Sequence, residues 1–181
     1  FGKNWYLYYT HYMNFGKKEG RKATGVSKIT NPVTEYNGVD YSAVYDFEYY
    51  AEKYSDIKKA YSDDDVGAIA HFVNFGMAEK RTGNKEFDVI SYWNKYPDLR
   101  KSFGNNWTSY YIHYMNFGKD EGRSATGTTE INGAITLYEG VDYSSVYNFK
   151  YYINKYPDIK KLYQNDDLGA IWHFVNFGIS E

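Results

Sequence analysis

The chain has 181 residues, a formal net charge of −2 and no cysteine. Without cysteine it has neither disulfides nor thiolate metal sites, and this charge leaves no basic surface for nucleic acid or anionic lipid. We therefore expect no nucleic-acid partner. No apolar run is long enough to cross a membrane, so we expect no membrane insertion either. We also expect no cofactor.

The sequence repeats itself at two periods. Residues 1–79 align without a gap on 103–181, and 51 of these 79 positions are identical. Within that period, 45–81 also aligns on 87–123. Repetition on this scale is typical of repeat architectures. We therefore divide the chain into a truncated first unit (1–25), a connector (26–44), a pair of units in 45–123 (second unit 45–81, third unit 87–123), a second connector (124–146) and a truncated fourth unit (147–181), and we expect it to be an excerpt of a longer array.

Each unit is predicted to consist of short helices, and the third unit shows the pattern in full. Phe87–Lys95 has helical apolar spacing, and Asp88 is placed to cap its start. A second helix is expected over Pro97–Phe103, because proline suits a first helical turn. Trp107–Phe117 is the longest predicted helix, and Gly118 is expected to end it in a left-handed conformation.

The long connectors carry alternating Thr, Ile and Val residues, at Val26–Tyr36 and Thr128–Tyr138. Asn132-Gly133 is a strong hairpin-turn signal, and Asn31-Pro32 replaces it in the first connector. We therefore predict a small β-hairpin in each. The joint between Arg81 and Phe87 is short, so the second and third units are predicted to dock directly as a pair.

All four histidines lie in one recurring phrase, His-Phe/Tyr-x-Asn-Phe-Gly. A residue that recurs in every unit suits a packing role better than catalysis, and no second metal ligand stands at a suitable spacing on the same helix. We expect the imidazoles to be buried and bonded to neighbouring backbone, the asparagines to cap carbonyls or bridge to the next unit, and the chain not to be an enzyme. These structural repeat positions are His11, His71, His113, His173, Asn14, Asn74, Asn116, Asn176, Gly16, Gly76, Gly118 and Gly178.

Two charged patterns also recur. The Glu-x-Arg that follows the glycine is predicted to form a local ion pair at the joint between units. The acidic runs Asp63–Asp65 and Asp166–Asp167 precede a predicted helix, where carboxylates favour the positive end of the helix dipole. We interpret these runs as helix caps, since no calcium-binding pattern follows them.

Aromatic residues dominate the chain, with 23 Tyr, 11 Phe and 4 Trp. The core must therefore be built largely from rings, and some tyrosine faces should reach the surface. Trp5 and Trp107 share one repeat position at the start of the long helix, where a ring can stack on a ligand or fix how the chain enters the helix. Trp93 and Trp172 are instead expected to fill core or joint space. The candidate ligand-binding residues are Trp5, Tyr6, Tyr9, Trp107, Tyr110 and Tyr111.

Four phrases occur together: YNGVDYSAVYDFEYY, KYPDLRKSFGNN, HFVNFGMAE and HYMNFGKDEGRSATG. In this combination the chain resembles the tyrosine-rich helical repeats of large secreted and surface proteins of Gram-positive anaerobes. The resemblance covers essentially the whole chain. It implies an extracellular array beside muramidase, amidase or polysaccharide-degrading domains, with a role in cell-wall attachment. Similar arrays on surface proteins bind host molecules such as immunoglobulin.

The predicted fold is all-α: short helix–turn–helix units in pairs, with small β-hairpin connectors. The expected function is non-catalytic, multivalent attachment of a secreted or cell-surface protein to cell-wall or other glycan through repeated aromatic patches. Two alternatives stay open. The first is a module that binds a host protein such as immunoglobulin, and the second is a passive spacer in a large surface protein.

Overall fold

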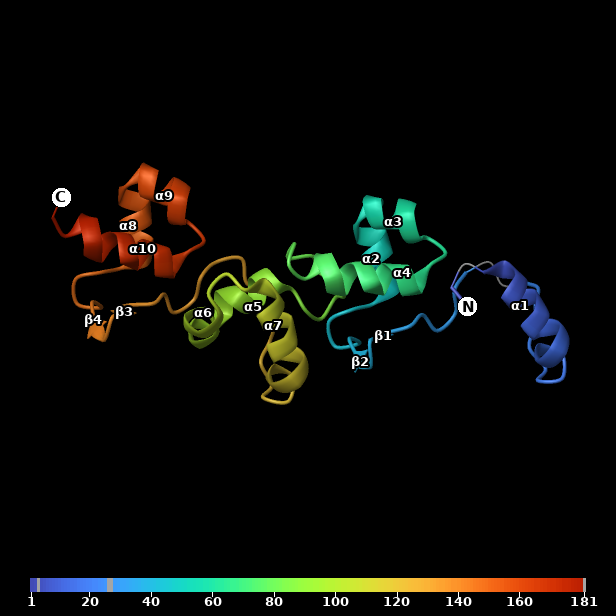
Figure 1. Ribbon diagram of the computed structural model, residues 1–181. Coiled ribbons are helices and arrows are strands. Elements are labelled where there is room, and N and C mark those ends of the chain that lie inside the picture. The colour runs from blue at the N-terminus through green and yellow to red at the C-terminus, as the bar shows by residue number, and fades with distance from the viewer. Residues whose placement is uncertain (3, 26–27, 181) are drawn as a thin grey trace. The chain divides into compact units, whose positions relative to one another are not determined.

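The computed structural model describes residues 1–181 except Lys3, Val26, Ser27 and Glu181 (Figure 1). It contains two compact parts. The N-terminal part comprises Phe1–Gly76 and Thr82–Lys85, and the C-terminal part comprises Met77–Arg81 and Glu86–Glu181. Both are built from short helices with one small antiparallel hairpin each, so the helix-dominated class is confirmed.

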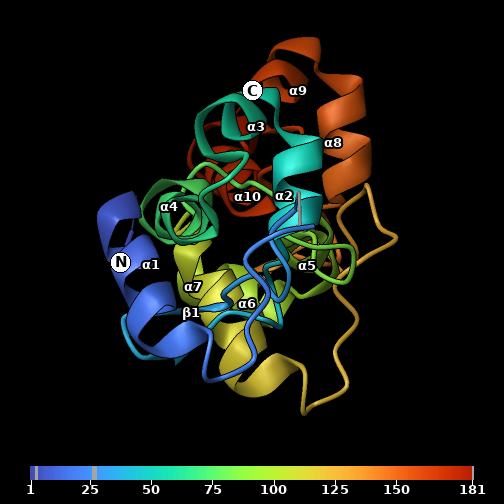
Figure 2. The same cartoon turned by 90° about the vertical axis from the view of Figure 1, so that its right-hand side faces the viewer.

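The same order of elements recurs along the chain. The N-terminal part contains α1 (Trp5–His11), η1 (Tyr12–Gly16), β1 (Glu35–Tyr36), β2 (Val39–Asp40), α2 (Phe47–Lys53), α3 (Ser55–Tyr61), α4 (Asp65–His71) and η2 (Phe72–Gly76). The C-terminal part contains α5 (Val89–Lys95), α6 (Pro97–Phe103), α7 (Trp107–His113), η3 (Tyr114–Gly118), β3 (Leu137–Tyr138), β4 (Val141–Asp142), α8 (Phe149–Lys155), α9 (Pro157–Tyr163), α10 (Asp167–His173) and η4 (Phe174–Gly178). Helices α8 and α9 lie side by side in both views (Figures 1 and 2).

Helix starts follow the predicted chemistry. The Asp88 carboxylate accepts a hydrogen bond from the Ser91 N–H and caps α5, as expected. Asp64 and Asp166 cap α4 and α10 in the same way, which confirms the acidic runs as caps. Such a cap stabilises a helix by about 1 kcal/mol. The α6 helix begins at Pro97, as predicted.

The hairpins lie further along the connectors than the sequence predicts. Strands β1 and β2 flank Asn37-Gly38, and β3 and β4 flank Glu139-Gly140. All four turn residues have positive φ, the backbone of the tight hairpin turn that matches strand twist. The Asn132-Gly133 turn prediction is therefore wrong. Of the predicted stretch 26–36, Val26 and Ser27 lie outside the described residues.

The glycine of the recurring phrase does not end its helix in a left-handed conformation. Instead the helix widens into one π-helical turn, shown by the bond from Lys119 N–H to the Tyr114 carbonyl. Gly118 lies inside this turn, and a Cβ there would overlap the Tyr92 hydroxyl. The prediction that Gly118 ends the helix in a left-handed conformation was wrong. Gly118 is needed because only a residue without a side chain lets the Tyr92 hydroxyl come this close. The left-handed residue is Gly122, with φ of +69°.

Every complete unit has a core of packed rings. In the second unit Tyr45, Tyr50 and Phe72 lie with ring centroids 5.1–5.7 Å apart. The position of Tyr45 holds Phe87 in the third unit and Tyr147 in the fourth. The hydroxyls of Tyr45 and Tyr147 are buried without a hydrogen-bond partner, and burial raises the pKa of both. The third unit avoids this cost, because phenylalanine carries no hydroxyl.

Tyr45→Phe and Tyr147→Phe are expected to raise the free energy of unfolding, by up to about 1–2 kcal/mol each, since each removes an unsatisfied buried hydroxyl. The measurement is thermal unfolding by calorimetry. Phe87→Tyr is the matched control and should destabilise the chain. Lower stability in both Tyr→Phe variants would contradict the assignment.

Candidate functional site

Two of the predicted platform residues lie in the core. Tyr110 and Tyr111 are 0% exposed. Their hydroxyls donate hydrogen bonds to the carbonyls of Gly104 and Arg81. Burial of both rings leaves no face on which a ligand can stack, which corrects the expectation that they flank an exposed platform.

The corresponding rings of α1 are exposed. Trp5, Tyr6 and Tyr9 are exposed at 62%, 73% and 74%, whereas helix α7 packs on α5 and α6. Since Tyr9 is exposed where its counterpart Tyr111 is buried, these rings do not define a surface that the units share.

Trp107 is half-buried and held on several sides. The Lys80 ammonium lies 4.3 Å from the centroid of its ring, and the rings of Trp93 and Tyr110 lie 5.8 Å away. This environment matches the alternative role of fixing the start of the long helix. Trp93 is buried, as predicted for a core residue.

The recurring histidines of the second, third and fourth units each bond to a tyrosine 21 residues earlier. The hydroxyls of Tyr50, Tyr92 and Tyr152 lie 3.1, 2.9 and 2.8 Å from Nδ1 of His71, His113 and His173. The imidazoles are half-buried, and their partner is a side chain instead of the predicted backbone group. Burial, followed by the charge of Arg123, lowers the pKa of His113, which favours its neutral form.

The phenylalanine that follows the asparagine is exposed in every unit. Phe15, Phe75, Phe117 and Phe177 are exposed at 57%, 59%, 58% and 47%. Behind each lies the histidine four residues earlier, with ring centroids 5.3–5.7 Å apart. The exposure of this phenylalanine was not predicted from the sequence, although the same residue occurs in all four phrases. The π-helical turn thus presents an identical ring four times.

An exposed asparagine directly precedes each exposed phenylalanine in the chain. Asn14, Asn74, Asn116 and Asn176 are all exposed. Asn176 donates to the Trp172 carbonyl, which confirms the predicted carbonyl cap there, and Asn74 donates to the Tyr36 hydroxyl. An exposed ring can stack on an apolar surface, and an exposed amide can bond a hydroxyl. The Asn–Phe pair is therefore the candidate site that all four units share.

A buried ion pair joins the third and fourth units inside the C-terminal part. Arg100 and Asp167 are 1% and 0% exposed, and Arg100 Nη2 lies 3.0 Å from Asp167 Oδ2. Asp167 also accepts the Ile135 N–H. Arg100 donates its remaining hydrogens to the carbonyls of Trp93, Asn94, Asn132 and Gly133. Every polar atom of the guanidinium is thus satisfied, and it ties α6, the connector and α10 together.

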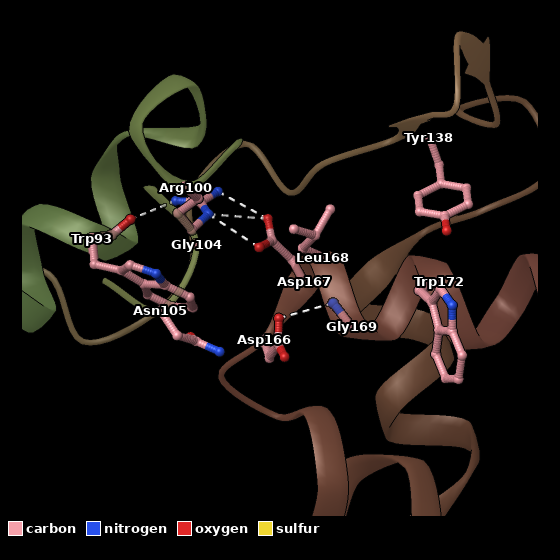
Figure 3. Close-up of a pocket in the computed structure, with 10 residues that line it drawn as sticks. All are labelled: Trp93, Arg100, Gly104, Asn105, Tyr138, Asp166, Asp167, Leu168, Gly169 and Trp172. Carbon is pink, nitrogen blue, oxygen red and sulfur yellow. Dashed lines mark hydrogen bonds and ion pairs between the residues drawn. The ribbon is translucent and has the colours of Figure 1, made fainter. Parts of the chain in front are cut away.

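This ion pair borders a hollow of about 340 Å³. Figure 3 shows Trp93 and Asn105 on one side of the pair and Tyr138 and Trp172 on the other. Trp172 is 41% exposed, so it does not fill the core, but it lines the hollow at this joint between units, which was the other expected place for it. Its counterpart in the second unit is Ala70, so this hollow is not a site that the units share.

Two further hollows occupy equivalent places in the second and fourth units. One, of about 460 Å³, is lined by Trp5, Phe47 and Glu48 among others, and the other, of about 310 Å³, by Phe149 and Lys150. The second unit has the negative Glu48 at a position where the fourth unit has the positive Lys150. A ligand common to both is therefore not indicated.

The remaining sequence predictions for the site have mixed outcomes. Glu19–Arg21, Glu79–Arg81 and Glu121–Arg123 each form the predicted ion pair, with N···O distances of 2.5–2.6 Å. Among the described residues, no group of three or more His, Asp or Glu side chains is placed to hold a metal ion. In the same residues, no helix has the length and apolarity needed to span a bilayer. Direct docking of the second and third units stays a prediction.

Arg100→Met is expected to destabilise the C-terminal part by about 3–5 kcal/mol, because it leaves Asp167 buried without its partner. Lys160→Met is the matched control: Lys160 holds the same repeat position but is exposed, and its loss should cost less than about 0.5 kcal/mol. The measurement is urea-induced unfolding followed by tryptophan fluorescence. Equal effects of the two substitutions would contradict a structural role for the ion pair.

His113 should make the chain less stable in mild acid. Its folded-state pKa is lowered, so the unfolded chain binds the proton more readily. This stabilisation is complete above the unfolded pKa of about 6.5 and is lost as the pH falls below it. Melting temperatures from pH about 8 to pH about 5 should fall more steeply for the wild type than for His113→Gln. Identical slopes would contradict the lowered pKa.

The chain was also compared with known proteins. No protein-family model, no curated protein and no solved structure matches it. Function must accordingly be argued from the residues, above all from the Asn–Phe pair that all four units expose.

Proposed function

We propose that this chain is a non-catalytic module of a secreted or cell-surface protein that attaches to bacterial cell-wall glycan through its repeated Asn–Phe pairs. A single observation carries the proposal: the same ring, beside the same amide, is exposed in all four units. A phenylalanine placed on the surface four times stabilises no core, and a ligand contact accounts for it. Here the pair replaces the tryptophan and tyrosine platform expected from sequence.

The chemistry of the pair favours a sugar. A pyranose ring has an apolar face of C–H groups that can cover the phenylalanine, and its rim of hydroxyls suits the neighbouring amide. One such contact is weak. Four contacts on one chain act through effective concentration, so a polymeric glycan with repeating sugars is held tightly without a single strong site. An array arrangement of the units, as predicted from sequence, would suit such a ligand.

The proposal is tested by retention on insoluble cell-wall sacculi. Replacing Phe15, Phe75, Phe117 and Phe177 together by alanine should lower the apparent affinity by about 100-fold or more, whereas one replacement should cost only a few-fold. Leu162→Ala is the matched control, because this residue is 68% exposed but its counterpart in the second unit is Ala60. Circular dichroism of each variant checks that the helices are retained.

Three outcomes would overturn this function. Unchanged retention of the fourfold variant would remove the Asn–Phe pairs from the site. Capture by immobilised immunoglobulin without binding to sacculi would make the chain a host-protein-binding module. Retention on neither bait would leave the spacer role.

A further inference from the structure

The two tryptophans that depart from the repeat pattern meet at one place in the C-terminal part. Trp93 stands in the third unit where the second and fourth units have Ala51 and Ile153. Trp172 stands in the fourth unit where the second has Ala70. Although they belong to different units, both line the hollow of about 340 Å³ beside the buried ion pair (Figure 3). Two changes that each single out one unit therefore serve the same hollow.

Trp93 forms a fixed wall of this hollow. Its ring is 4% exposed and lies 5.8 Å from the Trp107 ring, centroid to centroid. The central carbon of the Arg100 guanidinium lies 5.3 Å from the centroid of the Trp93 ring, and Arg100 donates a hydrogen bond to the Trp93 carbonyl. These contacts hold the wall in place before a ligand arrives, and a preformed surface lowers the entropy cost of binding.

Trp172 is the exposed platform of the hollow. A tryptophan that only filled the joint would be covered, as Trp93 is, yet Trp172 is 41% exposed. Its ring meets the Phe177 ring edge to face, with centroids 5.4 Å apart, so the exposed phenylalanine of the fourth unit continues the platform. The same face of the second unit is also open, since Phe75 is 59% exposed although the chain continues well beyond it.

Three polar side chains, Asn105, Tyr138 and Asp166, form the polar rim of the hollow. One Asp166 oxygen accepts the Gly169 N–H at 2.8 Å and caps α10. Within the described residues, the other oxygen of this carboxylate and the side chains of Asn105 and Tyr138 have no hydrogen-bond partner. A carboxylate accepts from hydroxyls, whereas an amide and a phenol can both donate and accept. The rim can therefore bond several hydroxyl groups of one ligand.

These features suit a sugar better than other small ligands. Small-molecule sites of this size have apolar walls and a few polar groups, as this hollow has. An entirely apolar ligand would leave the polar rim unpaired, which costs binding energy. The charges of Arg100 and Asp167 are paired with each other, so a ligand meets the negative charge of Asp166, which disfavours an anion. A pyranose ring offers C–H groups to the indole and hydroxyls to the rim.

We propose that this hollow is a sugar-binding subsite, in which one sugar of a cell-wall glycan stacks on Trp172 and bonds to the polar rim. The subsite rests on the proposed glycan-binding function and adds a contact particular to the joint between the third and fourth units. Because Phe177 packs on Trp172, a glycan chain that lies on the Asn–Phe pair of the fourth unit continues into the hollow. The Arg100–Asp167 pair holds its two sides together.

The test is a titration with a soluble tetrasaccharide of β-1,4-linked N-acetylglucosamine, followed by nuclear magnetic resonance. The four tryptophans give four indole N–H signals, so each ring reports separately. The signals of Trp172 and Trp93 should shift, and that of Trp5, in the N-terminal part, should not. We expect a dissociation constant on the order of 0.1–1 mM, because one sugar makes few contacts.

Two variants locate the sugar in the hollow. Trp172→Ala should weaken binding of the tetrasaccharide about tenfold or more. The fold accommodates alanine at this position, because the second unit has Ala70 there. Asp166→Asn retains a helix-capping residue and should weaken binding several-fold, since it removes a charge-assisted hydrogen bond. Trp5→Ala is the matched control: this ring is 62% exposed, and its loss should leave the affinity unchanged.

A triple variant separates this subsite from the Asn–Phe pairs. Replacing Phe15, Phe75 and Phe117 by alanine should weaken retention on sacculi about tenfold or more, yet leave binding of the tetrasaccharide unchanged. Trp172→Ala should have the opposite effect, with retention within a few-fold of the wild type. A Trp172 signal that the tetrasaccharide does not shift, or an affinity that Trp172→Ala leaves unchanged, would overturn the subsite even if sacculi are bound.

Discussion

One hydrogen bond sets the geometry of each complete unit: the bond between a tyrosine hydroxyl of the first helix and Nδ1 of the recurring histidine. The hydroxyl reaches that nitrogen only by passing over a residue without a side chain, and Gly76 and Gly118 provide this place. The helix widens into a π-helical turn at the same point. Since the histidine ring also packs behind the exposed phenylalanine, a half-buried hydrogen bond helps to determine where the outer ring stands.

The units are similar in sequence, yet their joints are not. At one repeat position the third unit has Arg100, whereas the second and fourth units have Lys58 and Lys160, both exposed. A planar guanidinium can serve a carboxylate and several carbonyls together, which a lysine ammonium cannot do in this geometry. In the third unit, the guanidinium at this position therefore fixes the unit to the connector that follows it.

Sequence reasoning succeeded where a structure is determined within a few residues. The Asp88 cap, the helix at Pro97 and the Glu121–Arg123 pair each involve residues two to three positions apart or a single proline. It failed where the partner is distant. Arg100 and Asp167 are 67 residues apart in the sequence, and no local sequence pattern predicts the bond between them.

The misplaced hairpin and the missed surface ring have different causes. Asn132-Gly133 does carry a left-handed glycine, with φ of +57°, but its carbonyls serve Arg100 instead of closing a ladder. The residue types of a turn alone do not show whether its carbonyls bond a distant side chain or close a β-ladder. The exposed Phe117 lay in a helix with an apolar pattern, and such a pattern predicts burial. The extra residue of a π-helical turn rotates that position outward, and only its recurrence in every unit could have signalled this.

The contacts of Arg100 also have a mechanical consequence. The connector 124–146 is long, but its middle is anchored to Arg100 of the third unit at the carbonyls of Asn132 and Gly133 and to Asp167 of the fourth unit through the Ile135 N–H. Tension along the chain would have to break this anchor before the connector could lengthen. Once released and fully extended, these two dozen residues span up to about 80 Å. This reserve of length would limit the force that a sudden pull places on the contacts by which the chain is held.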